Sequence, residues 1–162
     1  MSYSDDDLRG VGGWLAFLII VLAVFTPLRT VVSVLQLFGD ADLVEVLGDR
    51  WGLVMGLEIA LGTVAVLGAW YLAWRLNSVH SWKTIRIVIP GLWLLALGTL
   101  FVELVLLSLA AGLPLAVIAE AVAIDIVRAF IFSGVWSAYL LKSVRVRNTY
   151  AEPEEAVSEV FV

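Results

Sequence analysis

Residues 85–111 read IRIVIPGLWLLALGTLFVELVLLSLAA, an apolar run whose charged members are Arg86 and Glu103. A helix rises 1.5 Å per residue, so about 20 apolar residues cross the hydrocarbon core of a bilayer. The run is long enough for one crossing. It therefore predicts a transmembrane helix from about Ile85 to Ala111.

Three further runs of this kind lie from about Val11 to Phe38, Trp51 to Trp74 and Leu115 to Leu141. The chain has 162 residues, of which 62% are hydrophobic, and its mean hydropathy is +1.00. A soluble domain is usually about 45–50% apolar. Four spans with short connections therefore predict an all-α protein, an integral membrane antiparallel four-helix bundle.

The chain divides by composition into three parts. Residues 1–10 are expected to be a cytoplasmic N-terminal segment, and its acidic Asp5–Asp7 does not resemble the basic start of a secretory signal. Residues 11–150 hold the four transmembrane helices. Residues 151–162 carry four glutamates around Pro153, which predicts a disordered acidic tail.

Basic residues gather on one side of the predicted bundle, whereas the connection between the first two spans carries Arg50 among acids. The positive-inside rule then places both termini in the cytoplasm. Residues 39–50 are expected outside, as an ordered loop or as a short helix with Asp42 and Glu45 spaced like a capping box. The basic residues of the cytoplasmic side are Arg9, Arg75, Lys83, Arg86, Lys142, Arg145 and Arg147.

Composition also excludes several classes of site. The chain has no cysteine and one histidine, His80, so neither thiol chemistry nor a cysteine–histidine metal site is expected. A net charge of −5 argues against a nucleic-acid partner. We find no phosphate-binding loop or nucleophile elbow. The sequence therefore gives no catalytic, cofactor-binding or metal residue and points away from an enzyme.

Charged residues inside the apolar runs are the best lead to function. One charge near the bilayer centre costs roughly 2.5–3.5 kcal/mol, so these groups must be paired, hydrated or neutralised. Position along each span places them at overlapping depths in the outer half of the bundle. We treat them as a candidate intramembrane polar site: Arg29, Glu58, Glu103, Glu120, Asp125 and Arg128.

Helical spacing groups these residues further. Asp125 and Arg128 are three residues apart and can pair on one helix face. We expect Arg128 to contact Asp125, Glu120 or a carboxylate of a neighbouring helix. Polar residues of the first span form one stripe at helical spacing. That stripe is Thr26, Arg29, Thr30, Ser33 and Gln36.

Two arginines face four carboxylates in this set, a formal imbalance of −2. Some of the acids must be protonated, or water or a cation must enter from the outer face. Two interpretations stay open. Buried polar groups join helices in many membrane proteins without transport, and intramembrane charges also mark ligand and ion pathways.

The two ends of the membrane domain carry recognisable motifs. Gly12-Gly13-Trp14-Leu15 opens the first span, and Trp136 to Tyr150 closes the last, with Tyr139, Ser143, Arg145, Val146 and Thr149 inside that segment. These features resemble a family of small bacterial inner-membrane proteins known as domain of unknown function 2569. The resemblance implies a four-helix bacterial inner-membrane protein and no particular activity.

Three residues of the closing motif, Lys142, Arg145 and Arg147, are expected to contact anionic lipid head groups at about 1 kcal/mol each, or a partner. The partners expected are the lipid bilayer and a membrane protein or a second copy of the chain. The function expected first is an accessory or regulatory component of a membrane complex. The alternative is a small transporter, channel or proton- or cation-coupled module that uses the polar layer.

Overall fold

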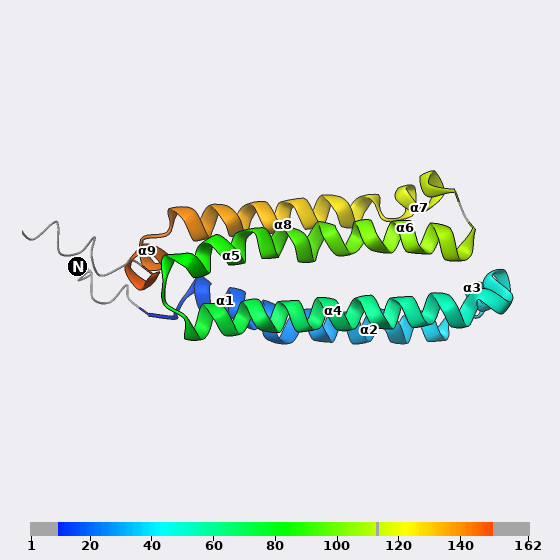
Figure 1. The fold of residues 1–162 in the computed structure, drawn as a ribbon, viewed down its shortest axis with the longest axis horizontal. Helices are drawn as coiled ribbons and strands as arrows, with labels where there is room; N and C mark the ends of the chain where they lie inside the picture. The colour runs from blue at the N-terminus through cyan, green and yellow to red at the C-terminus, as the bar shows by residue number, and fades with distance from the viewer. Residues whose placement is uncertain (1–9, 113, 151–162) are drawn as a thin grey trace, which may run out of the picture.

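The computed structural model describes residues 10–112 and 114–150, which form helices without a strand (Figure 1). The N-terminal segment before Gly10 and the acidic tail lie outside the described residues. Four helices are long and apolar enough to cross a membrane: Trp14–Gly39, Val44–Ser78, Trp82–Ala110 and Ala123–Lys142. The predictions of an all-α bundle and of a multi-pass membrane protein are confirmed.

The first and third spans each change winding partway. The first consists of α1 (Trp14–Ile20), the π-helical segment η2 (Val21–Phe25) and α2 (Thr26–Gly39). The third consists of α5 (Trp82–Trp93), the π-helical segment η4 (Leu94–Gly98) and α6 (Thr99–Ala111). The second span is the uninterrupted helix α4 (Trp51–Ser78). Single π-helical turns inside α-helices are rare and frequent at functional sites.

The fourth span differs from its prediction. A continuous helix was expected from Leu115 to Leu141, but the chain forms α7 (Leu115–Ala121) and α8 (Ala123–Lys142), with a break at Val122. The backbone there has φ −96° and ψ 3°, which is outside the helical region. Asp125 consequently lies in the first turn of α8. A carboxylate is stabilised there by the positive end of the helix dipole.

The connection between the first two spans contains α3 (Ala41–Leu47) and the 3₁₀ turn η3 (Gly48–Arg50). A short helix was one of the two expectations, and the structure selects it. The capping box was misplaced, since the helix begins one residue before Asp42. Gly48 ends it with φ +50°, a conformation that glycine adopts without steric cost.

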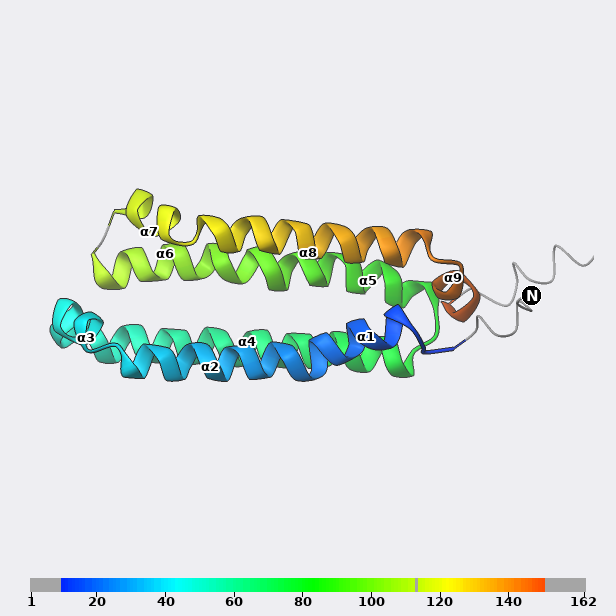
Figure 2. The same cartoon turned by 180° about the vertical axis from the view of Figure 1, so that it is seen from behind.

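The spans form two hairpins that lie side by side, one of α1, α2 and α4 and one of α5, α6 and α8 (Figures 1 and 2). α4 packs against α1 and α2 within its own hairpin and against α5 and α6 of the other. α5 packs in turn against α8. Among the described residues, α2 and α8 share no comparable packed seam. The bundle is therefore held together mainly through α4 and α5.

The main hydrophobic core fills the end of the bundle that carries α9 (Val144–Tyr150). Burying a large apolar side chain contributes roughly 1.5–3 kcal/mol. This end is therefore the strongly packed part, and it includes the large side chain of Trp136. The core residues include Leu15, Leu18, Leu22, Ala69, Leu72, Leu76, Leu92, Trp136, Leu140, Val146 and Tyr150.

Helix α9 was not anticipated, and it closes this end of the bundle. Tyr150 is fully buried, and its hydroxyl donates a hydrogen bond to the Leu76 carbonyl near the end of α4. The Gly10 N–H donates to Thr149 Oγ1 at 3.0 Å. The guanidinium of Arg145 occupies the space that a Gly12 side chain would need. The opening and closing motifs thus contact each other and fasten the two ends of the domain.

Candidate functional site

A cavity of about 660 Å³ lies between the four spans, beyond the main core. Its lining comes from η2, α2, α4, α5, η4, α6 and α8. Five of the six residues of the candidate polar site line it. They are Arg29, Glu58, Glu103, Asp125 and Arg128.

An ion pair crosses this cleft between the two hairpins. Arg29 of α2 and Arg128 of α8 approach the same carboxylate oxygen, Oδ1 of Asp125, at 3.6 and 3.2 Å. The expected contact between Arg128 and Asp125 is therefore present. The arginine side chains are 76% and 69% exposed, whereas Asp125 is 31% exposed. The two guanidiniums thus lie at the mouth of the cleft, and most of their N–H donors are open.

The remaining acids of the cleft lie nearer the α3 end than the arginines do. Glu58 of α4 and Glu103 of α6 are half-buried. Within residues 10–112 and 114–150, neither carboxylate has a hydrogen-bond or salt-bridge partner. Arg29, Glu58 and Asp125 are close enough to Glu103 for their charges to act on it. Two arginines and three acids give the cleft a formal charge of −1.

The charges are layered along the bundle. Counted from the α9 end at 1.5 Å per residue, Arg29 and Arg128 lie at about 21–23 Å. On the same scale Glu58 and Glu103 lie at about 30–32 Å. The residues Leu22, Ala69, Leu92 and Phe132 line the floor at about 12–15 Å. The cleft therefore passes from apolar to cationic to anionic toward the α3 end.

The local sequence explains how the first and third spans direct their charged residues toward the cleft. Each π-helical segment is followed directly by a threonine that lines the cleft, Thr26 or Thr99. Their hydroxyls donate to the carbonyls of Val21 and Leu95, inside the π-helical segments. The charged residue follows within one turn, Arg29 after Thr26 and Glu103 after Thr99. The change in winding thus sets which face of each helix meets the cleft.

Pro27 changes the hydrogen bonding of the first span. Proline has no N–H, so the Ala23 carbonyl lacks its usual helical donor. The indole N–H of Trp70 on α4 donates to that carbonyl at 2.9 Å. This bond was not foreseen, because Trp70 is not among the polar residues that the sequence placed inside the membrane. It fixes the helix that carries Arg29 against α4.

Glu120 does not join the cleft. It lies exposed on α7, beyond the break at Val122, so its side chain belongs to the surface of the α3 end. The three basic residues of the closing motif lie at the opposite end of the bundle. Lys142 and Arg147 are exposed there, and Arg145 is half-buried against Gly12 and Gly13.

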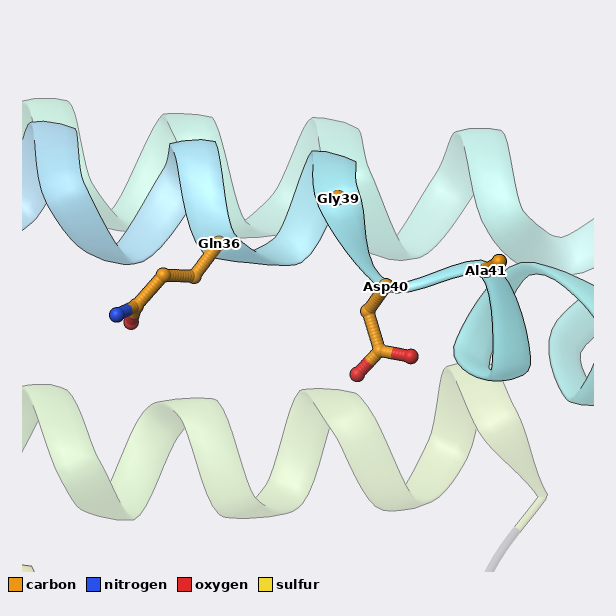
Figure 3. A pocket seen from close by; sticks show the side chains of 4 residues that line it. All are labelled: Gln36, Gly39, Asp40 and Ala41. Carbon is orange, nitrogen blue, oxygen red and sulfur yellow. The ribbon is translucent and has the colours of Figure 1, made fainter.

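A second hollow of about 530 Å³ lies at the α3 end of the first span. It is lined by Gln36, Gly39, Asp40 and Ala41, and the side chains of Gln36 and Asp40 point toward α6 (Figure 3). Gln36 continues the polar stripe of Ser33, which lines the cleft. The polar surface therefore runs from the end of the bundle toward the cleft.

In the described part of the chain, no group of three or more His, Cys, Asp or Glu residues is arranged to hold a metal ion. The cleft offers two guanidiniums at its mouth and two carboxylates nearer the α3 end. This arrangement can bind a charged or dipolar molecule through charge-assisted hydrogen bonds, which are the stronger kind.

Comparison with known proteins gives one match. No curated protein and no solved structure matches the chain. Residues 8–151 match a family described as a protein of unknown function, DUF2569. The match covers the whole membrane domain, including both end motifs that α9 brings together. The chain therefore belongs to the DUF2569 family, as its end motifs predicted.

Proposed function

We propose that the chain is a small multi-pass protein of the bacterial plasma membrane that binds a polar or charged ligand in the cleft. The observation that carries the proposal is the cavity of about 660 Å³ with unpartnered Glu58 and Glu103 beside exposed guanidiniums. Polar groups that only join helices are expected to pair tightly in a dry interface. The cavity volume falls within the range of about 300–1,000 Å³ typical of ligand sites.

The proposed orientation has both termini in the cytoplasm. Arg50 belongs to η3, which follows α3 at one end of the bundle. The basic residues of the helix ends at the opposite, α9 end are Arg75, Lys83, Arg86, Lys142, Arg145 and Arg147. In this orientation the carboxylate end of the cleft faces the outer side, and the main core separates the cleft from the cytoplasm. Transport across the membrane would require that core to open. Reversible binding from the outer side or the outer leaflet requires no such change.

Thiol labelling tests the proposal, because the chain contains no cysteine of its own. Thr99→Cys places a thiol in the cleft, and Val64→Cys places one on an exposed, lipid-facing position of α4 at similar depth. A small hydrophilic thiol reagent should modify the cleft variant, since thiolates form only where water reaches. Equal, negligible modification of both variants would make the cleft dry and reject ligand handling.

An accessory role in a membrane complex is the second candidate, and a separate observation favours it. The mouth of the cleft leaves Arg29 and Arg128 exposed at a depth where charge is costly. A helix of a partner protein or of a second copy would cover them. Purification in mild detergent and identification of co-purifying proteins would reveal such a partner. A monodisperse single copy that keeps ligand binding would count against it.

A further inference from the structure

The ligand class can be narrowed from the order of charges in the cleft. We propose that the cleft binds a zwitterionic head group with a phosphate and a primary ammonium, supplied by a phospholipid of the leaflet at the α3 end. This inference rests on the proposed function, since it identifies the ligand of the same cleft. Three features of the cleft support it: the order of its charges, the N–H donors of its two arginines and the apolar residues of its floor.

The layering follows the order of groups along a phospholipid that is drawn into the cleft from that leaflet, with its head group nearer the membrane centre than those of its neighbours. Along such a lipid, the acyl chains are followed by the phosphate and then by the ammonium, which is nearest to water. The cleft has an apolar floor at about 12–15 Å, guanidiniums at about 21–23 Å and carboxylates at about 30–32 Å from the α9 end. Each layer of the protein therefore meets the lipid group of complementary character.

The two guanidiniums provide the phosphate site. Arg29 and Arg128 each contact one oxygen of Asp125, and their side chains are 76% and 69% exposed. Each guanidinium has five N–H donors in a planar fork, so most remain available. Arginine forks bind phosphate through paired, charge-assisted hydrogen bonds. Their place at the mouth, where α2 and α8 lack a packed seam, gives a lipid lateral access.

The two unpartnered carboxylates favour a primary ammonium. Glu58 and Glu103 can accept N–H hydrogen bonds, which a quaternary ammonium cannot donate. Quaternary ammonium groups are bound by aromatic cages. The aromatic residues of the cleft lining are Phe25 and Phe132, and both lie below the arginines. An anionic head group would add charge to a cleft that is already formally −1.

The experiment measures lipid retention by native mass spectrometry of the full chain purified in detergent. The probes are phosphatidylethanolamine, phosphatidylglycerol and phosphatidylcholine with identical acyl chains, each added in equal amount. Wild type should retain phosphatidylethanolamine at least about tenfold more than the other two, as loss of a charge-assisted hydrogen bond implies. Equal retention of all three lipids would overturn the proposal.

Variants assign the selectivity to the acids. Glu58→Gln together with Glu103→Gln should bring retention of phosphatidylethanolamine down to that of phosphatidylcholine. The matched control Glu120→Gln, an acid outside the cleft, should keep the full selectivity. Arg29→Gln with Arg128→Gln should lower retention of every phospholipid. Selectivity that survives the double glutamate change would place the head group elsewhere and refute the assignment.

Two further sets of probes test the ammonium contact and the lipid source separately. A series of one, two and three N-methyl groups on phosphatidylethanolamine removes N–H donors without altering the protein, so retention should fall stepwise. Free phosphoethanolamine should displace the lipid poorly, and displacement at equal potency would overturn a lipid source. If Thr99→Cys stays reactive while lipid selectivity is absent, the cleft is still hydrated, as the proposed function requires, and only the proposed identity of the ligand fails.

Discussion

Replacing Asp125 by asparagine removes the carboxylate on which both arginines of the cleft converge. The side chains have nearly the same size, so the change mainly removes charge. Arg29 and Arg128 then lose their ion pairs at 3.6 and 3.2 Å, and the two hairpins lose the ion pair that joins α2 to α8. The cost of this change depends on whether water fills the cleft.

The expected loss in the free energy of unfolding differs between a hydrated cleft and a dry one. Ion pairs exposed to water contribute about 0–1 kcal/mol each, and the arginine side chains are 76% and 69% exposed. A hydrated cleft therefore predicts a loss of at most about 2 kcal/mol in the free energy of unfolding. In a dry cleft, two uncompensated charges would cost about 2.5–3.5 kcal/mol each. The loss would then be about 5 kcal/mol or more.

The assay is reversible unfolding in mixed micelles, followed by circular dichroism, with wild type, Asp125→Asn and the control Glu120→Gln. We expect Asp125→Asn to lose at most about 2 kcal/mol and Glu120→Gln to stay within about 0.5 kcal/mol. A loss of about 5 kcal/mol for Asp125→Asn would refute a hydrated cleft. Polar groups would then act as dry inter-helix contacts.

Three further outcomes are expected. Arg128→Leu should lower the free energy of unfolding in micelles by about 1 kcal/mol. Arg147→Leu, at an exposed position, should lower it by less than about 0.5 kcal/mol. Equal losses for the two variants would contradict a role of Arg128 in the cleft. In intact cells, an impermeant thiol reagent should label Glu45→Cys and spare Lys83→Cys; the reverse pattern would invert the proposed topology. Burial, assisted by the charge of a neighbouring tyrosine, raises the pKa of Tyr150 above that of the unfolded chain. Its stabilisation is therefore complete below about pH 10 and is lost as pH rises further. Tyr150→Phe should abolish that part of the alkaline loss and cost about 1–3 kcal/mol at pH 7, because a backbone carbonyl of α4 loses its donor. Unfolding titrations at several pH values check this, and an unchanged alkaline loss in the variant would contradict it.

Much of the fold follows from the sequence because apolar length and charge placement are local properties. Runs of hydrophobic residues identify the four spans within a few residues of the observed ends, except that the fourth begins at Ala123 and not at Leu115. The break at Val122 could not be seen, since no proline or glycine marks it and apolar residues continue on both sides. Helix α9 was also missed. Its burial depends on contacts with Gly10 and Leu76, which are distant in sequence.

The sequence identified most of the charged residues that line the cleft, but it predicted their arrangement only in part. Depth along a span is proportional to residue number, so the sequence predicted overlapping depths for these charges, whereas counting from the observed helix ends separates the arginines from Glu58 and Glu103 by about 9 Å along the bundle. Which side chains meet across helices depends on how the helices pack. Because the break at Val122 separates α7 from α8, Glu120 on α7 does not line the cleft. The π-helical segments escaped prediction because their winding change has no reliable local signature in the sequence.

Water in the cleft is the central claim, and collision of a nitroxide label with paramagnetic probes measures it most directly. Ser33→Cys lines the cleft, and Leu35→Cys lies two residues along α2 on an exposed, lipid-facing position at nearly the same depth. In lipid nanodiscs, the label at Ser33 should collide preferentially with a water-soluble nickel complex, and the label at Leu35 with oxygen, which concentrates in lipid. Equal preference for oxygen at both positions would contradict a hydrated, ligand-binding cleft.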